Sequence, residues 1–306
     1  MILITGITGF VGSYLAEYYG RGVVGIKRWR SPLDNIKHLN IPLYDCDLTD
    51  LSAVISVLRE VKPDKIHHLA AQSYVPSSFT NPVQTLNVNV IGTVNLLEAI
   101  RITGQNPLIH ICSSSEVYGQ PEYFPIDEKH PTNPISPYAV SKLGEDRLGY
   151  AYWKAYGLNV VITRMFTHTG ARRGEVFVCS DFAKQIAMNE KYGGNDICVG
   201  NLKSVRTVCD VRDAVGAYSL LDINMVGEVF NIGGDETMSI AQILSGLEKL
   251  SNKSYNVVVE ESRMRPVDVT MQIPNCEKFR EWTGWKPKIR VDETLESILE
   301  YWRERV

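Results

Sequence analysis

Apolar and polar positions alternate in two different ways along the first half of the chain. Leu51 to Val61 places its apolar residues at helical spacing, and Val88 to Arg101 does so over a longer stretch. Short apolar runs, which predict strands, lie between such stretches at residues 1–4, 23–26, 65–71, 108–112 and 159–164. This alternation predicts a parallel sheet with helices on both faces, whose binding groups gather beyond the carboxyl ends of the strands.

The first predicted strand runs directly into a glycine-rich loop. Gly6, Gly9 and Gly12 are spaced Gly-x-x-Gly-x-x-Gly, and a helical pattern follows from Tyr14. Glycines there permit a tight turn and a close approach of the backbone to a pyrophosphate, while the helix N-terminus attracts the phosphates. The loop therefore predicts a dinucleotide site, with a ligand-free glycine turn as the alternative.

The second half of the chain predicts a smaller domain interleaved with the first. The 306 residues exceed the usual size of a single domain. Residues 226–234 form a strand pattern that we expect to return to the main sheet, and Ser239 has the position of a helix N-cap. We expect an α/β fold with a Rossmann-type doubly wound parallel sheet. The dinucleotide-binding domain would span 1–165 with return segments near 205–234, and a mainly substrate-binding domain 166–306.

Composition excludes several classes of protein. The net charge of −3 and the lack of a Lys/Arg run argue against a nucleic-acid surface, and no apolar stretch is long enough to span a bilayer. The six cysteines show neither Cys-x-x-Cys nor zinc-finger spacing. We expect reduced, mostly buried thiols in a cytoplasmic protein with no metal and no nucleic-acid or membrane partner.

A tyrosine and a lysine four residues apart carry the predicted chemistry. Ser136 and Pro137 have the positions of a helix N-cap and first turn, so Tyr138 and Lys142 share one helix face. The Lys142 ammonium then favours the Tyr138 phenolate and pulls its pKa from roughly 10 toward neutrality. Such a phenol can take a proton from a sugar hydroxyl while hydride leaves the same carbon.

The residues after the second predicted strand bear on the choice of dinucleotide. NAD enzymes usually place a carboxylate there to bind the ribose 2′-hydroxyl. Here Lys27, Arg28 and Arg30 stand instead, and they suit a 2′-phosphate. We expect NADP, with NAD possible, and a solvated basic loop as the ligand-free alternative.

Almost the whole chain resembles the extended short-chain dehydrogenases/reductases, and within them the GDP-mannose 4,6-dehydratases. The blocks that carry the resemblance are Lys27–Ser31 with His38-Leu39, Asp47–Asp50, Leu69–Ser73, Asn89–Thr93, Ser113–Gly119, Ser136–Lys142, Arg172–Val178, Gly200–Arg206, Arg265–Asp268 and Gly284–Pro287. The resemblance implies a nucleotide-sugar lyase acting on a GDP-sugar, assembled as a homodimer or homotetramer.

The resemblance also implies a role for each matching residue. Tyr138 takes the 4-hydroxyl proton, Lys142 holds the nicotinamide ribose, Glu116 removes the C5 proton, and Ser114 bonds the C4 oxygen. The cofactor would contact Gly6, Thr8, Gly9, Phe10, Val11, Gly12, Arg28, Arg30, Asp47, Leu48, Leu69, Ala70, Ala71, Tyr138 and Lys142. The substrate would contact Ser73, Thr167, Arg172, Arg173, Val178, Asn201, Arg206 and Arg265.

The chain departs from the dehydratase pattern at three places. Thr167 stands where asparagine is usual, Arg206 to Asp210 replaces an Arg-Asp-aromatic run, and Phe10-Val11 replaces Gln-Asp. The compact length also resembles the sister GDP-4-keto-6-deoxymannose reductases. An NADPH-dependent 4-reductase or epimerase is therefore the alternative function, and a non-catalytic dinucleotide sensor is a more distant one.

Overall fold

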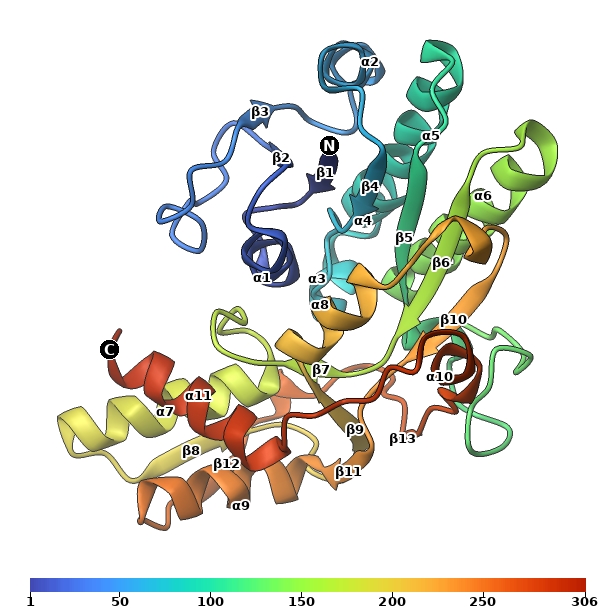
Figure 1. The fold of residues 1–306 in the computed structure, drawn as a ribbon. Helices are drawn as coiled ribbons and strands as arrows, with labels where there is room; N and C mark the ends of the chain where they lie inside the picture. The colour runs from blue at the N-terminus through green and yellow to red at the C-terminus, as the bar shows by residue number, and fades with distance from the viewer. The chain divides into compact units, whose positions relative to one another are not determined.

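The computed structural model describes residues 1–306. Its main sheet has seven strands in the order β10-β6-β5-β4-β1-β2-β3, and every pair is parallel (Figure 1). The strands are β1 (Ile2–Thr5), β2 (Val23–Lys27), β3 (Leu43–Asp45), β4 (Lys65–His68), β5 (Leu108–Ser114), β6 (Val160–Met165) and β10 (Val229–Ile232). The order reverses beside β1, which is the doubly wound arrangement that the sequence predicts.

The helices between these strands include the two that the apolar spacing predicts, over 51–61 and 88–101. They are α1 (Phe10–Tyr19), α2 (Leu51–Val61), α3 (Val75–Thr80), α4 (Pro82–Leu86), α5 (Gly92–Thr103), α6 (Pro137–Tyr156) and the short η2 (Ser115–Tyr118). The predicted helix over 88–101 begins as η1 (Asn87–Ile91), a π-helical turn that continues into α5.

Successive side chains of each strand point to opposite faces of the sheet. Ile66 and Ile109 belong to the apolar core that also contains α2 and α5 residues. The next residues, His67 and His110, contact Tyr19 of α1 and Tyr218 of α8 (Val211–Ser219) on the other face. Helices therefore cover both faces of the sheet. Because successive side chains of a strand point to opposite faces, neighbouring residues contact different helices.

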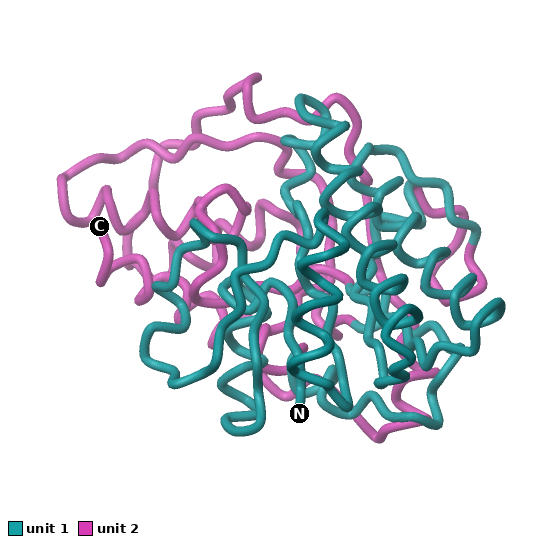
Figure 2. The backbone as a smooth tube through the Cα atoms, turned by 90° about the horizontal axis from the view of Figure 1, so that it is seen from above, with its two compact units in different colours: residues 1–119, 131–165, 215–232 teal, residues 120–130, 166–214, 233–306 magenta.

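The chain divides into two compact units (Figure 2). Unit 1 comprises residues 1–119, 131–165 and 215–232, and unit 2 comprises 120–130, 166–214 and 233–306. The segment 226–234 supplies β10 of the main sheet, as predicted. Residues 120–130, which the sequence analysis places in the first domain, cluster with unit 2.

Unit 2 has small sheets and helices around its own apolar core. Its elements are β7 (His168–Thr169), α7 (Val178–Tyr192), β8 (Asp196–Val199), β9 (Val205–Asp210), β11 (Glu236–Ser239), α9 (Ile240–Ser251), β12 (Asn256–Val259), η4 (Glu261–Arg263), β13 (Met271–Gln272), α10 (Glu277–Thr283) and α11 (Val291–Arg303). The remaining element, η3 (Ile223–Met225), lies in unit 1. Ser239 caps α9 in a reciprocal capping box with Gln242, as predicted for a helix start there.

All six cysteines are free thiols, and four of them are buried. No helix combines the length and the hydropathy needed to cross a membrane.

Candidate active site

The glycine loop lies between β1 and α1 and has no room for a side chain at Gly6 or Gly12. Gly6 has φ +70°, and a Cβ there would meet the Ala70 backbone at 2.9 Å. A Cβ at Gly12 would lie 2.4 Å from the Gly6 carbonyl oxygen. The α1 N-terminus has no side-chain cap and no acidic residue in its first turn, which consists of Phe10, Val11 and Gly12. A backbone cradle at an uncapped helix start fits a pyrophosphate.

The segment after β4 is tied to the same loop. The Thr5 hydroxyl accepts hydrogen bonds from the backbone N–H groups of Leu69 and Ala70, both at 3.1 Å. These bonds hold the ends of the two central strands, β1 and β4, in register where they leave the sheet. Ala71 and Ser73 continue this segment toward α3, and Ser73 is exposed.

Two adjoining cavities lie beyond the ends of β2 and β3. One has a volume of about 560 Å³ and is lined by Arg28, Arg30 and Asp47, among others. The other, of about 780 Å³, is also lined by Arg28 and Asp47, together with residues of α4 and η1. Leu48 is buried beside them. Lys27, which the sequence groups with the arginines, is paired with Asp45 of β3 instead. Two arginines in a cavity fit a phosphate on the adenosine ribose.

Tyr138 and Lys142 lie on one face of α6, and both are buried. Ser136 caps the helix by accepting from the Ala139 N–H at 3.0 Å, and Pro137 occupies the first turn. Burial raises the pKa of Tyr138, although the Lys142 charge and a hydrogen bond with Ser114 act to lower it. The sequence predicts a phenol pulled toward neutrality, but desolvation of the phenolate outweighs the lysine in the free protein.

Ser114 and Glu116 mark the end of β5. The Ser114 hydroxyl accepts from the Glu116 N–H at 3.2 Å and so starts the η2 turn. Glu116 is half-buried, whereas Ser114 is buried and hydrogen-bonded to Tyr138. The structure thus brings Ser114, Tyr138 and Lys142 together, and Glu116 lies in the η2 turn that Ser114 caps.

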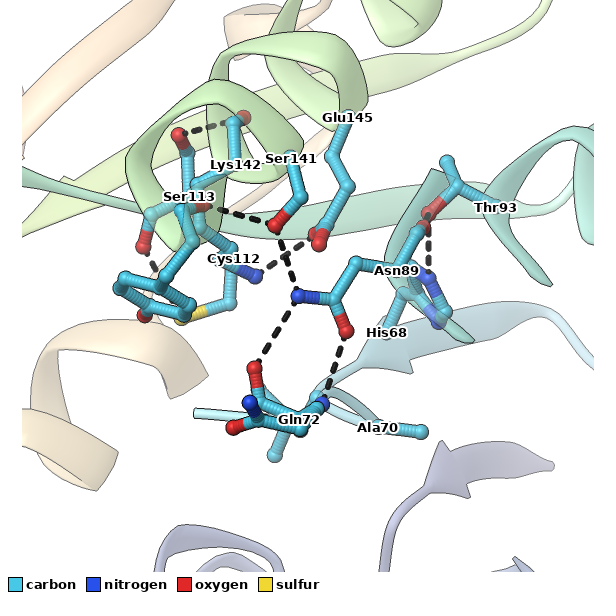
Figure 3. A network of polar contacts seen from close by, with 12 residues as sticks. His68, Ala70, Gln72, Asn89, Thr93, Cys112, Ser113, Ser141, Lys142 and Glu145 are labelled. Carbon is cyan, nitrogen blue, oxygen red and sulfur yellow. Dashed lines mark hydrogen bonds and ion pairs between the residues drawn. The ribbon is translucent and has the colours of Figure 1, made fainter. Parts of the chain in front are cut away.

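A buried polar network joins β1 and β4 to the helix that carries Tyr138 (Figure 3). His68 bonds the hydroxyls of Thr5 and Thr93, both at 2.9 Å. Asn89 of η1 accepts from the Gln72 N–H at 2.7 Å and donates to the Ser141 hydroxyl at 2.8 Å. Ser141 in turn donates to the Tyr138 carbonyl at 2.7 Å. Apart from Tyr138, these residues were not predicted as site residues, although Gln72, Asn89, Thr93 and Ser141 lie in blocks that carry the family resemblance.

In unit 2, Asp268 gathers three of the predicted substrate residues. Its carboxylate accepts from Asn201 at 3.0 Å, from Arg206 at 3.4 Å and from Arg265 at 3.5 Å. It also accepts from Ser204 at 2.7 Å. Asp268 was not predicted as a site residue, although it ends the Arg265-Pro-x-Asp268 block. It holds two guanidinium groups close together, in an arrangement that suits a diphosphate.

The remaining predicted substrate residues lie around β7 and the start of α7. Arg172 adopts φ +66°, and the Arg173 guanidinium lies over the Phe177 ring at 3.7 Å from its centroid. Val178 is the first residue of α7, and the Thr167 carbonyl accepts from the Cys209 N–H at 3.0 Å.

Comparison with known proteins identifies the family. The model of the family described as GDP-mannose 4,6 dehydratase matches residues 3–298. The chain belongs to this family. It is 39% identical to the GDP-mannose 4,6-dehydratase of Vibrio cholerae serotype O1, with 97% of this chain and 92% of that one covered. It is 32% identical to the human GDP-mannose 4,6 dehydratase, with 97% and 90% covered.

A second kind of relative matches over nearly its full length. The GDP-6-deoxy-D-mannose reductase of Pseudomonas aeruginosa is 32% identical, with 100% of this chain and 98% of that one covered. The solved structure of RMD from Pseudomonas aeruginosa complexed with NADPH superposes with a TM-score of 0.87 at 30% identity, covering 100% and 99% of the two chains. The expected fold and family resemblance are thus confirmed for this member of the GDP-mannose 4,6-dehydratase family.

Proposed function

We propose that the protein catalyses the NADP-dependent dehydration of GDP-mannose to GDP-4-keto-6-deoxymannose through transient oxidation at C4. The observation that carries this proposal is the grouping of Ser114, Tyr138 and Lys142, with Glu116 in the turn directly after β5, in a chain of this family. A dinucleotide sensor would need the glycine loop but not this set of proton-transfer groups.

Each of these side chains then has a defined role. Tyr138 accepts the 4-hydroxyl proton, and Ser114 hydrogen-bonds the C4 oxygen. Lys142 binds the nicotinamide ribose and stabilises the phenolate of Tyr138 by its charge. Glu116 removes the C5 proton, which a ketone at C4 makes acidic, and water then leaves from C6. NADP, when bound, supplies the redox chemistry at C4 and C6.

We assign cofactor binding to unit 1 and substrate binding mainly to unit 2. The glycine loop would hold the pyrophosphate of NADP, and Arg28 and Arg30 its 2′-phosphate. Arg206 and Arg265, held by Asp268, would bind the diphosphate of the GDP-sugar. We further propose a cytoplasmic homodimer or homotetramer that works without nucleic acid or membrane.

The second candidate is NADPH-dependent reduction of a GDP-4-keto-6-deoxyhexose at C4. Chain length favours this candidate. The alignment with the Pseudomonas reductase spans 309 positions, whereas the alignments with the Vibrio and human dehydratases span 350 and 342. The dehydratases therefore contain segments that this chain of 306 residues lacks.

Incubation with GDP-mannose in heavy water distinguishes the two candidates. A dehydratase should lose water from the substrate and incorporate deuterium at C5, as read by mass spectrometry and NMR. Glu116→Gln keeps the shape of the side chain but cannot accept the proton, so it should accumulate reduced cofactor in a single turnover and release no 4-keto-6-deoxy product. If the wild type leaves GDP-mannose unchanged but oxidises NADPH with a 4-keto sugar, the reductase replaces the dehydratase.

A further inference from the structure

A second carboxylate, distinct from Glu116, lies beside the lysine of the proposed site. Glu145 is three residues after Lys142 on α6, and its side chain is fully buried. Its Oε2 accepts from the Lys142 ammonium at 2.7 Å, as Figure 3 shows. Tyr138, Lys142 and Glu145 therefore follow one another along the same helix face at spacings of four and three residues.

The ion pair that ties this helix to the sheet is formed by the next residue, Asp146, and not by Glu145. Asp146 is equally buried, but both of its oxygens accept from Arg164 of β6, at 2.8 and 3.3 Å. Glu145 has only Lys142: its other oxygen, Oε1, is buried and has no hydrogen-bond partner. A buried carboxylate with one unsatisfied oxygen is costly, and its position opposite a proposed site lysine calls for a functional explanation.

Glu145, Lys142 and Tyr138 influence one another's pKa values. Burial raises the pKa of Glu145 to about 7, so at alkaline pH the carboxylate is ionised. The ionised carboxylate raises the pKa of Lys142 and also that of Tyr138, whereas Lys142 lowers that of Tyr138. The other titratable groups facing this set are His68 of β4, His110 and Cys112 of β5, and Asp146.

We propose that Glu145 is a positioning residue, whose carboxylate fixes the Lys142 ammonium and offsets the effect of its charge on Tyr138. The proposal deepens the proposed function, because it assigns a role in setting up the Tyr138 base. An ammonium has three donors, and one is committed to Glu145. Two remain for a vicinal diol such as the ribose of a dinucleotide. Glu145 thus sets both the direction in which Lys142 points and the pH at which Tyr138 loses its proton.

The free protein provides a test that does not depend on turnover. Ultraviolet difference spectra between the wild type and Tyr138→Phe isolate the ionisation of this one tyrosine from the other fourteen of the 15 in the chain. The same difference is then taken in a Glu145→Gln background. The amide keeps the shape and the acceptor for Lys142 but removes the charge, so Tyr138 should ionise about one pH unit lower. Glu145→Asp keeps the charge and is the matched control, with an ionisation close to that of the wild type.

NADP affinity and the pH profile of turnover test the same role of Glu145 by other means. NADP affinity, measured by calorimetry, should stay within about threefold in Glu145→Gln, because the amide oxygen still holds Lys142. In turnover assays, the acidic limb of kcat/KM should move to lower pH by the same amount as the Tyr138 ionisation. A failure of the proposed function would remove the turnover profile alone, and the titration of Tyr138 would still decide the role of Glu145.

The proposal is overturned if Glu145→Gln leaves the Tyr138 ionisation unshifted, or if Asp and Gln shift it equally. If Glu145→Gln does not fold, Glu145→Ala is measured instead. It also removes the charge, so Tyr138 should again ionise at a lower pH than in the wild type, and an unshifted ionisation would overturn the proposal.

Discussion

Arg164 and Asp146 form a buried two-bond ion pair that ties β6 to α6, the helix of Tyr138 and Lys142. Removing one member leaves the other charge buried without a partner. Asp146→Asn should therefore lower the free energy of unfolding by about 3–5 kcal/mol, measured by urea titration. Arg101→Gln, which breaks an exposed pair with Glu98, is the control and should change the midpoint little. Equal effects of the two variants would contradict a structural role for the buried pair.

Tyr138→Phe should reduce kcat by about 10² to 10⁴, because the variant has no hydroxyl to take the substrate proton. NADP affinity should persist, since the ring remains in place. Tyr150→Phe changes an exposed tyrosine of the same helix and should keep full activity. Near-normal turnover of Tyr138→Phe would rule out the proposed chemistry.

Arg28→Ala should weaken NADP binding about ten- to a hundredfold and NAD binding much less. The charged contact to a 2′-phosphate is worth roughly 1.5–3 kcal/mol, and NAD lacks that group. Calorimetry with both dinucleotides measures the ratio. Lys37→Ala removes an exposed charge that lines neither cavity, so it should leave the ratio unchanged. Unaltered selectivity in Arg28→Ala would place the 2′-phosphate elsewhere.

Acid should destabilise the protein through its buried histidines. Burial, with the nearby Lys142 charge, lowers the pKa of His68 to about 3, and burial also lowers those of His67 and His110. The unfolded chain takes up a proton as pH falls below about 6.5, whereas folded His68 stays neutral. The stability that His68 contributes is therefore complete above about pH 6.5 and is lost toward pH 3.

At about pH 5 the loss from His68 amounts to about 2 kcal/mol relative to neutral pH. His68→Gln keeps hydrogen-bonding groups near Thr5 and Thr93 but does not titrate. Its urea stability should fall less than that of the wild type between about pH 7.5 and about pH 5. Parallel pH profiles of the two proteins would show that His68 does not cause the acid sensitivity.

Local patterns were sufficient to predict every strand of the main sheet except β3, together with α1, α2, α5 and α6. The glycine spacing predicted the turn between β1 and α1, and Ser136-Pro137 predicted the start of α6. Both signals act within a few residues, because caps, backbone angles and helix spacing depend on near neighbours. The alternation of strands and helices then allowed few topologies, so the doubly wound sheet followed from the sequence.

The functional roles of the site residues remain predictions, and some charges found partners that the sequence did not indicate. Lys27 pairs with Asp45 on a neighbouring strand, and Asp268 gathers Arg206 and Arg265 from separate segments. Neither arrangement has a short sequence signature, because the partners are distant in the chain.

The sequence by itself determined that Tyr138 and Lys142 share a helix face, because that follows from helical geometry. Only the tertiary structure decided the electrostatic balance between them. Burial under the sheet opposes the phenolate, and Glu145 neutralises part of the lysine charge within the same buried set. Spacing is a property of the chain, whereas solvation depends on everything that folds around it, so the pKa of Tyr138 could not be inferred from the motif alone.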